Sequence, residues 1–350
     1  MKKKFIVSLL ILGLFATACG GSSDPEVIKW GFIPAEEAEA LADVSEPFVE
    51  FMSDYIGIPV EASITQDYAG AITGLGSGQL DVAGLGPLGY VLAQQQYPDK
   101  VEAISKAVRY GAATYHGQIV TNDPSVCKTT PVIGAWKNIN GTPQIVEGSS
   151  TTPPDVVALQ VGWTFGDNGL EPEVLESGET VSPGYACEAD LTSMIGKRVA
   201  AADAASTSGY LFPGLAAQNA GIDLDDDIDL FFAGGHTGVI QALYNGDADF
   251  GFSFDDARRG IRKENPDVGE KLIVIGISPE IPNDVIAVNS DMSQELKDLI
   301  YEGMQAFLAQ GEESEEFFDI FYGWTEAEPV EDSEFDPVRE AQEAFGITEP

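Results

Sequence analysis

Three consecutive hydroxyl residues, Ser206, Thr207 and Ser208, follow a predicted strand and precede a helical run. The first backbone N–H groups of a helix have no intrahelical partners, so these groups and the three hydroxyls converge on one point. Such a set of donors can hold an oxyanion. A single serine would be explained as a simple helix cap, but three hydroxyls before Gly209 exceed what capping requires.

His236 is the second candidate, because it is one of two histidines in the chain and follows Gly234 and Gly235 at a predicted helix start. Its ring can donate to an oxyanion from one nitrogen when neutral and from both when protonated. A core histidine would be unusual at such a position. We therefore expect His236 to meet the same ligand as the three hydroxyls.

A helix–glycine–aspartate–strand unit occurs twice, at residues 68–81 and 236–249. One copy would mean little, but two copies at one offset predict two lobes built on a shared α/β plan. Tyr68 and His236 then begin equivalent helices, and a ligand between the lobes would meet both helix N-termini. The matched pairs are Ile72 and Ile240, Leu75 and Leu243, Gly78 and Gly246, and Asp81 and Asp249.

The elements around these residues alternate between short β-branched or aromatic runs and helical periodicity, which predicts an α/β fold. Apolar residues at three- and four-residue steps predict amphipathic helices from Leu41 to Ile56 and from Leu296 to Leu308. The expected strands are Val27 to Ile33, Pro59 to Ile64, Asp81 to Leu85, Arg198 to Ala202, Leu230 to Ala233, Asp249 to Phe254 and Leu272 to Ile277.

The composition is strongly acidic, with 18 Lys and Arg against 57 Asp and Glu and a formal net charge of −39. Without a basic patch, nucleic-acid binding is excluded. The 44% of hydrophobic residues exclude a disordered chain. The acidic surface does not argue against an anionic ligand, because salt screens it over about 8 Å, whereas N–H and O–H donors act at contact.

The N-terminus is typical of an exported lipoprotein. Three lysines precede an apolar run from Phe5 to Phe15, which predicts a signal peptide over residues 1–18. Residues 16–19 resemble a lipobox, with Ala16 where leucine is usual, so we expect Cys19 to be lipidated and residues 19–26 to form a tether. A cleaved, unlipidated signal is the alternative. The predicted location is extracytoplasmic, anchored to the cell membrane.

The remaining cysteines, Cys127 and Cys187, have no histidine or further cysteine nearby in the sequence. In an exported protein such a pair favours a disulfide over a metal site. The pair would join the ends of a segment at about 124–190 that is rich in glycine, proline, serine and threonine.

Taken together, these segments resemble the PhnD-like phosphonate-, phosphite- and phosphate-binding proteins of ABC importers, which have the type II periplasmic-binding fold. The resemblance implies a non-enzymatic, cofactor-free solute-binding protein with two lobes, each a mixed sheet flanked by helices, and two crossover strands as hinge. It implies a first lobe of residues 27–121 and 285–350 and a second lobe of 122–284. The segment at about 124–190 departs from the family's pattern, because it is far longer than the usual connection there, and we expect it to be an insertion in the second lobe. The segments that carry the resemblance are Trp30 to Pro34, Asp67 to Ala83, Gly86 to Leu88, Ser206 to Pro213, Gly235 and His236, Asn245 to Asp249, Pro282 to Val285, and Phe335 to Arg339.

The resemblance also implies site residues and partners. Ser206, Thr207 and Ser208 would grip the phosphorus-bound oxygens, and other members of the site would surround them. Acidic residues would accept from a P–OH group or from the ammonium of an aminoalkylphosphonate. The partners would be a small phosphorus oxyanion and the permease of an ABC transporter. The protein would be a monomer that contacts the membrane only through its N-terminal lipid. The further implied contacts are Tyr68, Tyr115, His236, Asp256 and Asp284.

Three alternatives remain at this point. A hydrolase could use Ser208, His236 and Asp256, although no Gly-x-Ser-x-Gly elbow surrounds the serine. A ferric-ion-binding protein could use Tyr68 and Tyr115 together with the same histidine and aspartate. A binder of sulfonate or nitrate on the same fold is the closest alternative to the phosphorus oxyanion.

Overall fold

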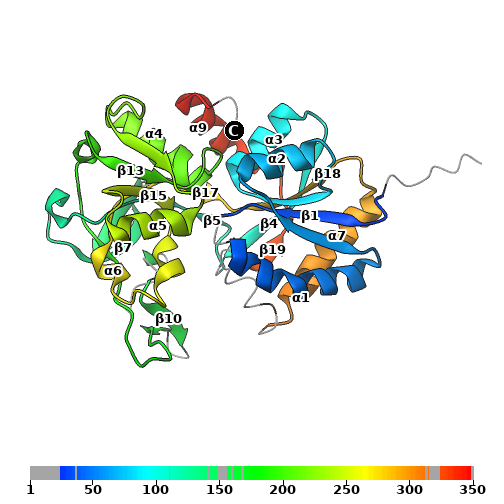
Figure 1. Ribbon diagram of the computed structural model, residues 1–350, viewed down its shortest axis with the longest axis horizontal. Helices are drawn as coiled ribbons and strands as arrows, with labels where there is room; N and C mark the ends of the chain where they lie inside the picture. The colour runs from blue at the N-terminus through cyan, green and yellow to red at the C-terminus, as the bar shows by residue number, and fades with distance from the viewer. Residues whose placement is uncertain are drawn as a thin grey trace, which may run out of the picture.

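A computed structural model describes residues 24–35, 38–109, 111–139, 142–147, 156–158, 161–166, 169–311, 314 and 324–347. It shows two sheets, each with its own helices, side by side and joined by the short strands β5 (Thr114–Tyr115) and β17 (Ile281–Pro282) (Figure 1). We call these units the first and second lobes. The predicted mixed α/β fold is confirmed. The expected signal peptide, Cys19 and the start of the tether lie outside the described residues.

The first lobe contains a six-stranded sheet in the order β19-β4-β18-β3-β1-β2. Helices α1 (Ala38–Ile56) and α7 (Gln294–Leu308) cover one face, where the apolar stripe predicted for each helix buries Phe48 and Ile300 against Trp30. Helices α2 (Tyr68–Gly76) and α3 (Pro87–Gln96) cover the other face. The strands are β1 (Ile28–Phe32), β2 (Val60–Ile64), β3 (Val82–Leu85), β4 (Val101–Arg109), β18 (Val285–Asn289) and β19 (Trp324–Glu328).

The second lobe contains a nine-stranded sheet in the order β14-β13-β15-β6-β16-β12-β7-β8, with β9 also paired to β7. Helices α5 (His236–Asn245) and α6 (Val268–Lys271) lie on one face and α4 (Phe212–Asn219) on the other. The strands are β6 (Gly117–Thr121), β7 (Val132–Ile139), β8 (Thr142–Glu147), β9 (Val156–Ala158), β12 (Tyr185–Ala186), β13 (Arg198–Ala201), β14 (Asp229–Phe232), β15 (Phe250–Phe254) and β16 (Ile273–Ile277); β10 (Trp163–Gly166) and β11 (Gly169–Pro172) form a separate hairpin.

The seven predicted strands are all present, with ends that differ from the prediction by at most one residue. One predicted lobe border is wrong. Strand β6 pairs with β15 and β16 of the second sheet, so the chain has already entered the second lobe before Gly117 and not after Thr121. The return crossing runs through β17, and β18 of the first sheet begins at Val285, where the second border was expected.

The repeated unit has the same hydrogen bonds in both lobes. The backbone N–H of Lys29 donates to Asp81 Oδ2 at 2.8 Å, and that of Arg198 donates to Asp249 Oδ2 at 3.0 Å. Each aspartate therefore ties the start of its strand to the neighbouring strand. Gly246 ends α5 in the left-handed region at φ 80°, which a side chain would disfavour.

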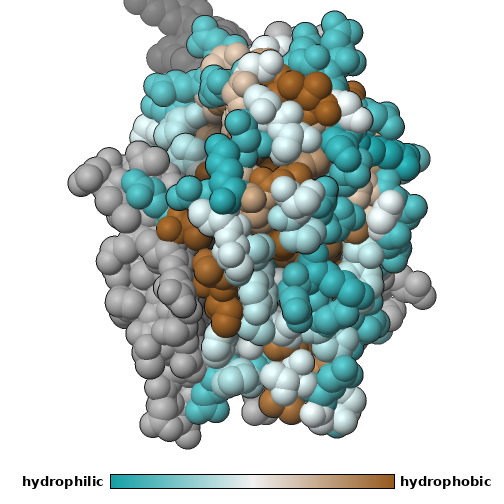
Figure 2. Space-filling model, turned by 90° about the vertical axis from the view of Figure 1, so that its left-hand side faces the viewer, coloured by the Kyte–Doolittle hydropathy of each residue, from teal (hydrophilic) through white to brown (hydrophobic). Residues whose placement is uncertain are grey.

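Cys127 and Cys187 form a disulfide with their Cα atoms 5.7 Å apart, as predicted. The disulfide joins the ends of the predicted insertion. Within that insertion, β12 pairs with β16 and with β7, so the segment extends the second sheet at one edge. The outer side of the second lobe presents mainly hydrophilic residues with small hydrophobic areas between them (Figure 2).

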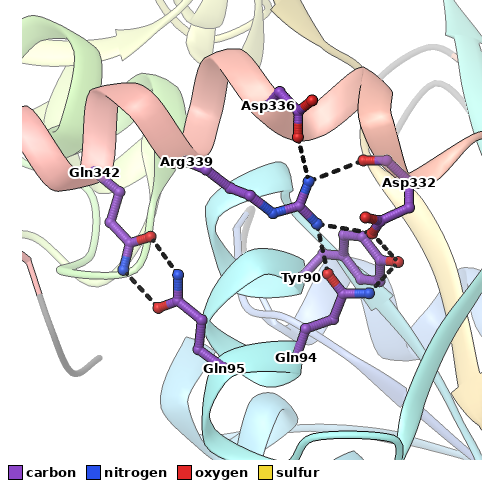
Figure 3. A network of polar contacts seen from close by, with 7 residues as sticks. All are labelled: Tyr90, Gln94, Gln95, Asp332, Asp336, Arg339 and Gln342. Atoms are coloured by element: carbon purple, nitrogen blue, oxygen red, sulfur yellow. Dashed lines mark hydrogen bonds and ion pairs between the residues drawn. The ribbon is translucent and has the colours of Figure 1, made fainter.

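The C-terminal helix α9 (Asp336–Phe345) rests on both lobes. Figure 3 shows its polar contacts with α3: Arg339 donates to Gln94 at 2.7 Å, and the side-chain amides of Gln342 and Gln95 pair at 2.8 and 2.9 Å. At its other end Phe345 packs edge-on against Tyr210 of the second lobe, with ring centroids 5.1 Å apart. Across the described residues, no helix has the length and apolarity to cross a bilayer.

Candidate functional site

A small cavity lies where the lobes meet. Most of its walls are residues that the sequence predicted, drawn from both lobes and from the crossover strand β5. Its lining comprises Ile33, Ala35, Tyr68, Gly86, Arg109, Tyr115, Ser206, Thr207, Ser208, His236, Phe254 and Asp284.

The three hydroxyl residues enter the cavity at the turn η3 (Thr207–Leu211), and each is at most 3% exposed. Ser206 caps this turn, because its Oγ accepts from the N–H of Gly209 at 3.0 Å. The simple capping interpretation therefore applies to Ser206, but not to Thr207 or Ser208. A Cβ atom at Gly209 would lie 2.9 Å from Cε1 of His236, so only glycine lets the turn approach the imidazole this closely.

His236 is the first residue of α5, and its backbone N–H donates to the carbonyl of Ala35 in the first lobe at 2.8 Å. Its ring packs edge-on against Phe254, and Nδ1 lies 2.9 Å from Oγ of Ser253. Burial, with a smaller contribution from the charge of Arg109, lowers the pKa of His236 to about 3. The imidazole is therefore neutral at physiological pH and has one N–H to donate.

Two tyrosines contribute phenols to the cavity. Tyr68 begins α2, where Asp67 caps the helix by accepting from the N–H of Gly70. Tyr115 lies in β5, and burial and the nearby carboxyl of Asp284 raise its pKa above the usual value. The phenol of Tyr115 therefore stays protonated and can donate a hydrogen bond.

Arg109 also lines the cavity and was not predicted. It ends β4, is 9% exposed, and holds its guanidinium carbon 5.2 Å from the ring centroid of Tyr115 and 5.1 Å from that of Phe254. These aromatic faces stabilise the cation at the wall. The sequence signal that could have identified Arg109 is its position as a basic residue shortly before the crossover in a strongly acidic chain.

The two predicted aspartates have different environments. Asp284 lines the cavity, and burial raises its pKa to about 6, while Arg109 opposes part of that rise. Asp256 is absent from the lining and forms a buried ion pair with Arg258, whose Nη2 lies 2.7 Å from Asp256 Oδ2. We therefore remove Asp256 from the predicted ligand set, because the carboxylate is already neutralised by a cation of its own lobe.

Comparisons with known proteins show what this chain is similar to. A family model described as "ABC transporter, phosphonate, periplasmic substrate-binding protein" matches residues 30–335. The phosphate-import protein PhnD of Mycolicibacterium smegmatis is 26% identical over 84% of this chain and 79% of its own length. The phosphonates-binding periplasmic protein of Escherichia coli is 25% identical over 97% of this chain and 84% of its own length.

A solved structure supports the fold. PhnD1 from Prochlorococcus marinus, in complex with methylphosphonate, superimposes with a TM-score of 0.65 at 18% identity, covering 92% of this chain and 99% of that one.

Proposed function

The chain belongs to the family of periplasmic substrate-binding proteins of phosphonate ABC transporters, and on this premise we propose that it captures a small phosphorus oxyanion in the cavity between its lobes. The observation that carries the proposal is the meeting of donors from both lobes at one place. Hydroxyls of Ser206, Thr207 and Ser208 lie on one side, and Tyr68 lies on the other. Hydrogen bonds to a charged oxygen contribute about 1.5–3 kcal/mol each, so several of them outweigh a screened acidic surface.

Asp284 favours phosphorus over sulfur oxyanions. A carboxyl with a pKa near 6 shares a proton well with an anion that itself carries a P–OH group. A sulfonate has no such proton and would meet the carboxylate as a like charge. Among the alternatives, this residue therefore separates phosphate, phosphite or an alkylphosphonate from a sulfonate.

The ion pair of Asp256 with Arg258 also bears on which ligand the cavity binds. With Asp256 paired, Asp284 is the one predicted aspartate left at the cavity for the ammonium of an aminoalkylphosphonate, and a ferric ion needs anionic ligands in addition to the tyrosines. The cavity instead presents the guanidinium of Arg109, which repels either cation. We infer that the ligand is a compact oxyanion with no cationic tail.

The two lobes would close around this ligand, with β5 and β17 as hinge. Backbone N–H groups of His236 and Leu88 already make hydrogen bonds across the border, to Ala35 and to Thr207. A ligand that contacts both lobes stabilises this closed shape, which is the form a permease would recognise. We further propose that Cys19 carries the lipid anchor and that the protein acts as an extracytoplasmic monomer.

The test is calorimetric titration of the purified protein with phosphate, phosphite, methylphosphonate, 2-aminoethylphosphonate and an alkanesulfonate. The double variant Ser206→Ala/Thr207→Ala should lose at least about 100-fold in affinity for the preferred phosphorus compound, because two hydrogen bonds to its oxygens disappear. Thr192→Ala/Ser193→Ala is the matched control, since these hydroxyls lie in the same lobe at the turn η2 (Leu191–Met194), outside the cavity lining. Equal affinity in both double variants would reject the site, and preference for the sulfonate would reject the ligand class.

A further inference from the structure

Ser253 contacts the imidazole of His236 from outside the cavity lining. It belongs to β15, its side chain is fully buried, and it is absent from the cavity lining. Its Oγ lies 2.9 Å from Nδ1 of His236. The ring nitrogen that remains for a ligand is therefore Nε2, and the state of Nε2 depends on which partner donates in the bond between Ser253 and Nδ1.

Gln118 stands directly opposite Ser253 on the neighbouring strand β6. Side chains of directly opposed residues leave the same face of a sheet, so the Gln118 amide shares with Ser253 the face covered by α5. The Gln118 side chain is fully buried, and within the described part of the chain neither its Nε2 nor its Oε1 has a hydrogen-bond partner. Buried amides that lack a local partner are uncommon and call for an explanation.

The possible hydrogen-bond directions give that explanation. A neutral imidazole carries one proton, so it donates from one nitrogen and accepts at the other. A serine oxygen can accept two hydrogen bonds and donate one, so an amide NH₂ of Gln118 directed at Oγ of Ser253 through a water would leave the serine proton still in need of an acceptor. The contact that the described structure gives Oγ is Nδ1 of His236. A serine that donates to Nδ1 leaves the ring proton on Nε2.

We propose that Ser253, assisted by Gln118, is a positioning residue that donates to Nδ1 of His236 and thereby holds the imidazole in its Nε2–H form. Only this form can donate a hydrogen bond to an oxyanion in the cavity. The opposite tautomer would direct a lone pair at the ligand oxygen. The effect of the tautomer on ligand binding rests on the proposed function, whereas the tautomer itself can be observed in the ligand-free protein.

The tautomer can be measured directly, because the chain has only His116 and His236. Two-bond ¹H–¹⁵N correlation spectra of ¹⁵N-labelled, ligand-free protein at neutral pH distinguish a protonated from an unprotonated ring nitrogen. His116, whose Nδ1 lies 3.2 Å from Asp255 Oδ2, supplies an internal reference, and His116→Gln completes the assignment. We expect wild-type His236 to carry its proton on Nε2, and a proton on Nδ1 would overturn the proposal outright.

Variants separate positioning from mere packing. Ser253→Ala should let the Nδ1–H form appear and weaken binding of methylphosphonate by about 10- to 100-fold, the effect of losing one hydrogen bond to a charged oxygen. Ser253→Thr should keep the tautomer and most of the affinity. Gln118→Met should shift the tautomer in the same direction as Ser253→Ala, but by less.

Ser105→Ala is the matched control, because Ser105 in β4 is equally buried, and in the described structure its hydroxyl has no partner and lies outside the cavity lining. It should change neither the tautomer nor the affinity. If Ser253→Ala left both unchanged, Ser253 would be a packing residue only. If wild-type protein bound no phosphorus oxyanion while the tautomer still responded to Ser253→Ala, the proposed function would fail and the positioning role would stand.

Discussion

The hydroxyl oxygen of Thr207 accepts a hydrogen bond from the backbone N–H of Leu88, 2.8 Å away across the border between the lobes. Leu88 lies in the first turn of α3, where backbone N–H groups have no partner inside the helix. A hydroxyl can accept one hydrogen bond and donate another. Thr207 can therefore join the lobes through its oxygen while its proton serves a ligand.

This double role predicts a coupled loss in Thr207→Val, which keeps the shape of the side chain and removes the hydroxyl. The buried N–H of Leu88 would lose its acceptor, so the closed state should weaken by about 1–3 kcal/mol. We expect weaker ligand binding and a larger radius of gyration for the ligand-bound protein in small-angle X-ray scattering. Thr207→Ser retains the hydroxyl and should behave like wild type. If Thr207→Val lost affinity without becoming less compact, or became less compact without losing affinity, joining the lobes and donating to the ligand would be separate roles of Thr207.

The buried pair of Asp256 and Arg258 predicts a loss of stability rather than of binding. Both side chains are completely inaccessible to solvent, and two hydrogen bonds of 2.7 and 2.9 Å connect them. Asp256→Asn would leave a buried guanidinium without its counter-charge, at a cost of about 3–5 kcal/mol. Chemical denaturation measures the free energy of unfolding, and titration of folded protein measures the affinity.

The exposed pair of Lys100 and Asp291 offers the control, because its side chains are 48% and 65% exposed. Asp291→Asn should change the free energy of unfolding by no more than about 1 kcal/mol. A folded Asp256→Asn protein of normal stability that no longer bound ligand would return Asp256 to the ligand set.

The two environments of the aspartates also show what sequence could reveal. The repeated units were predictable because helix, glycine cap and strand are local patterns, and Asp81 and Asp249 repeat the same bond to a neighbouring strand. The hydroxyl run and His236 followed from their places at helix starts. Asp256 was expected as a ligand, but it forms a buried ion pair with Arg258. That burial depends on parts of the chain distant in sequence, because Arg258 also donates to the carbonyls of Tyr185 and Leu272.

Arg109 was missed for a related reason. Its contacts, Tyr115 and Phe254, come from β5 and from the second lobe, and β4 itself was not among the predicted strands. The border at Thr121 failed because β6 continues directly from the crossover with no break in composition. Pairing between distant strands decided both features, and a single sequence carries little information about such pairing.

The raised pKa of Asp284 predicts a change in the pH dependence of stability. With a folded pKa of about 6 against 3.8 for the free side chain, the native protein binds more protons than the unfolded chain between these values. Stability contributed by Asp284 therefore falls as pH rises from about 4 to 6 and stays lost above that range. Asp284→Asn should equal wild type near pH 4 and exceed its stability at pH 7, by at most about 3 kcal/mol.

The measurement is the difference in free energy of unfolding between wild type and Asp284→Asn at several pH values. Taking the difference cancels the contribution of His236, whose pKa is lowered to about 3 and whose effect on stability therefore has the opposite sign. A difference that does not vary with pH would show that Asp284 titrates normally and would remove the argument against sulfonate.

The disulfide between Cys127 and Cys187 should stabilise the second lobe without contributing to binding. It closes a segment of 60 residues, for which cross-linking of the unfolded chain is worth about 2–4 kcal/mol. Neither cysteine lines the cavity, and the strands and turn that hold Ser206 and His236 lie outside this segment. Cys127→Ser/Cys187→Ser should therefore unfold at a lower temperature while keeping wild-type affinity for the preferred phosphorus compound. Reductant should lower the melting temperature of wild type alone, and a parallel loss of affinity would instead assign the insertion a role at the cleft.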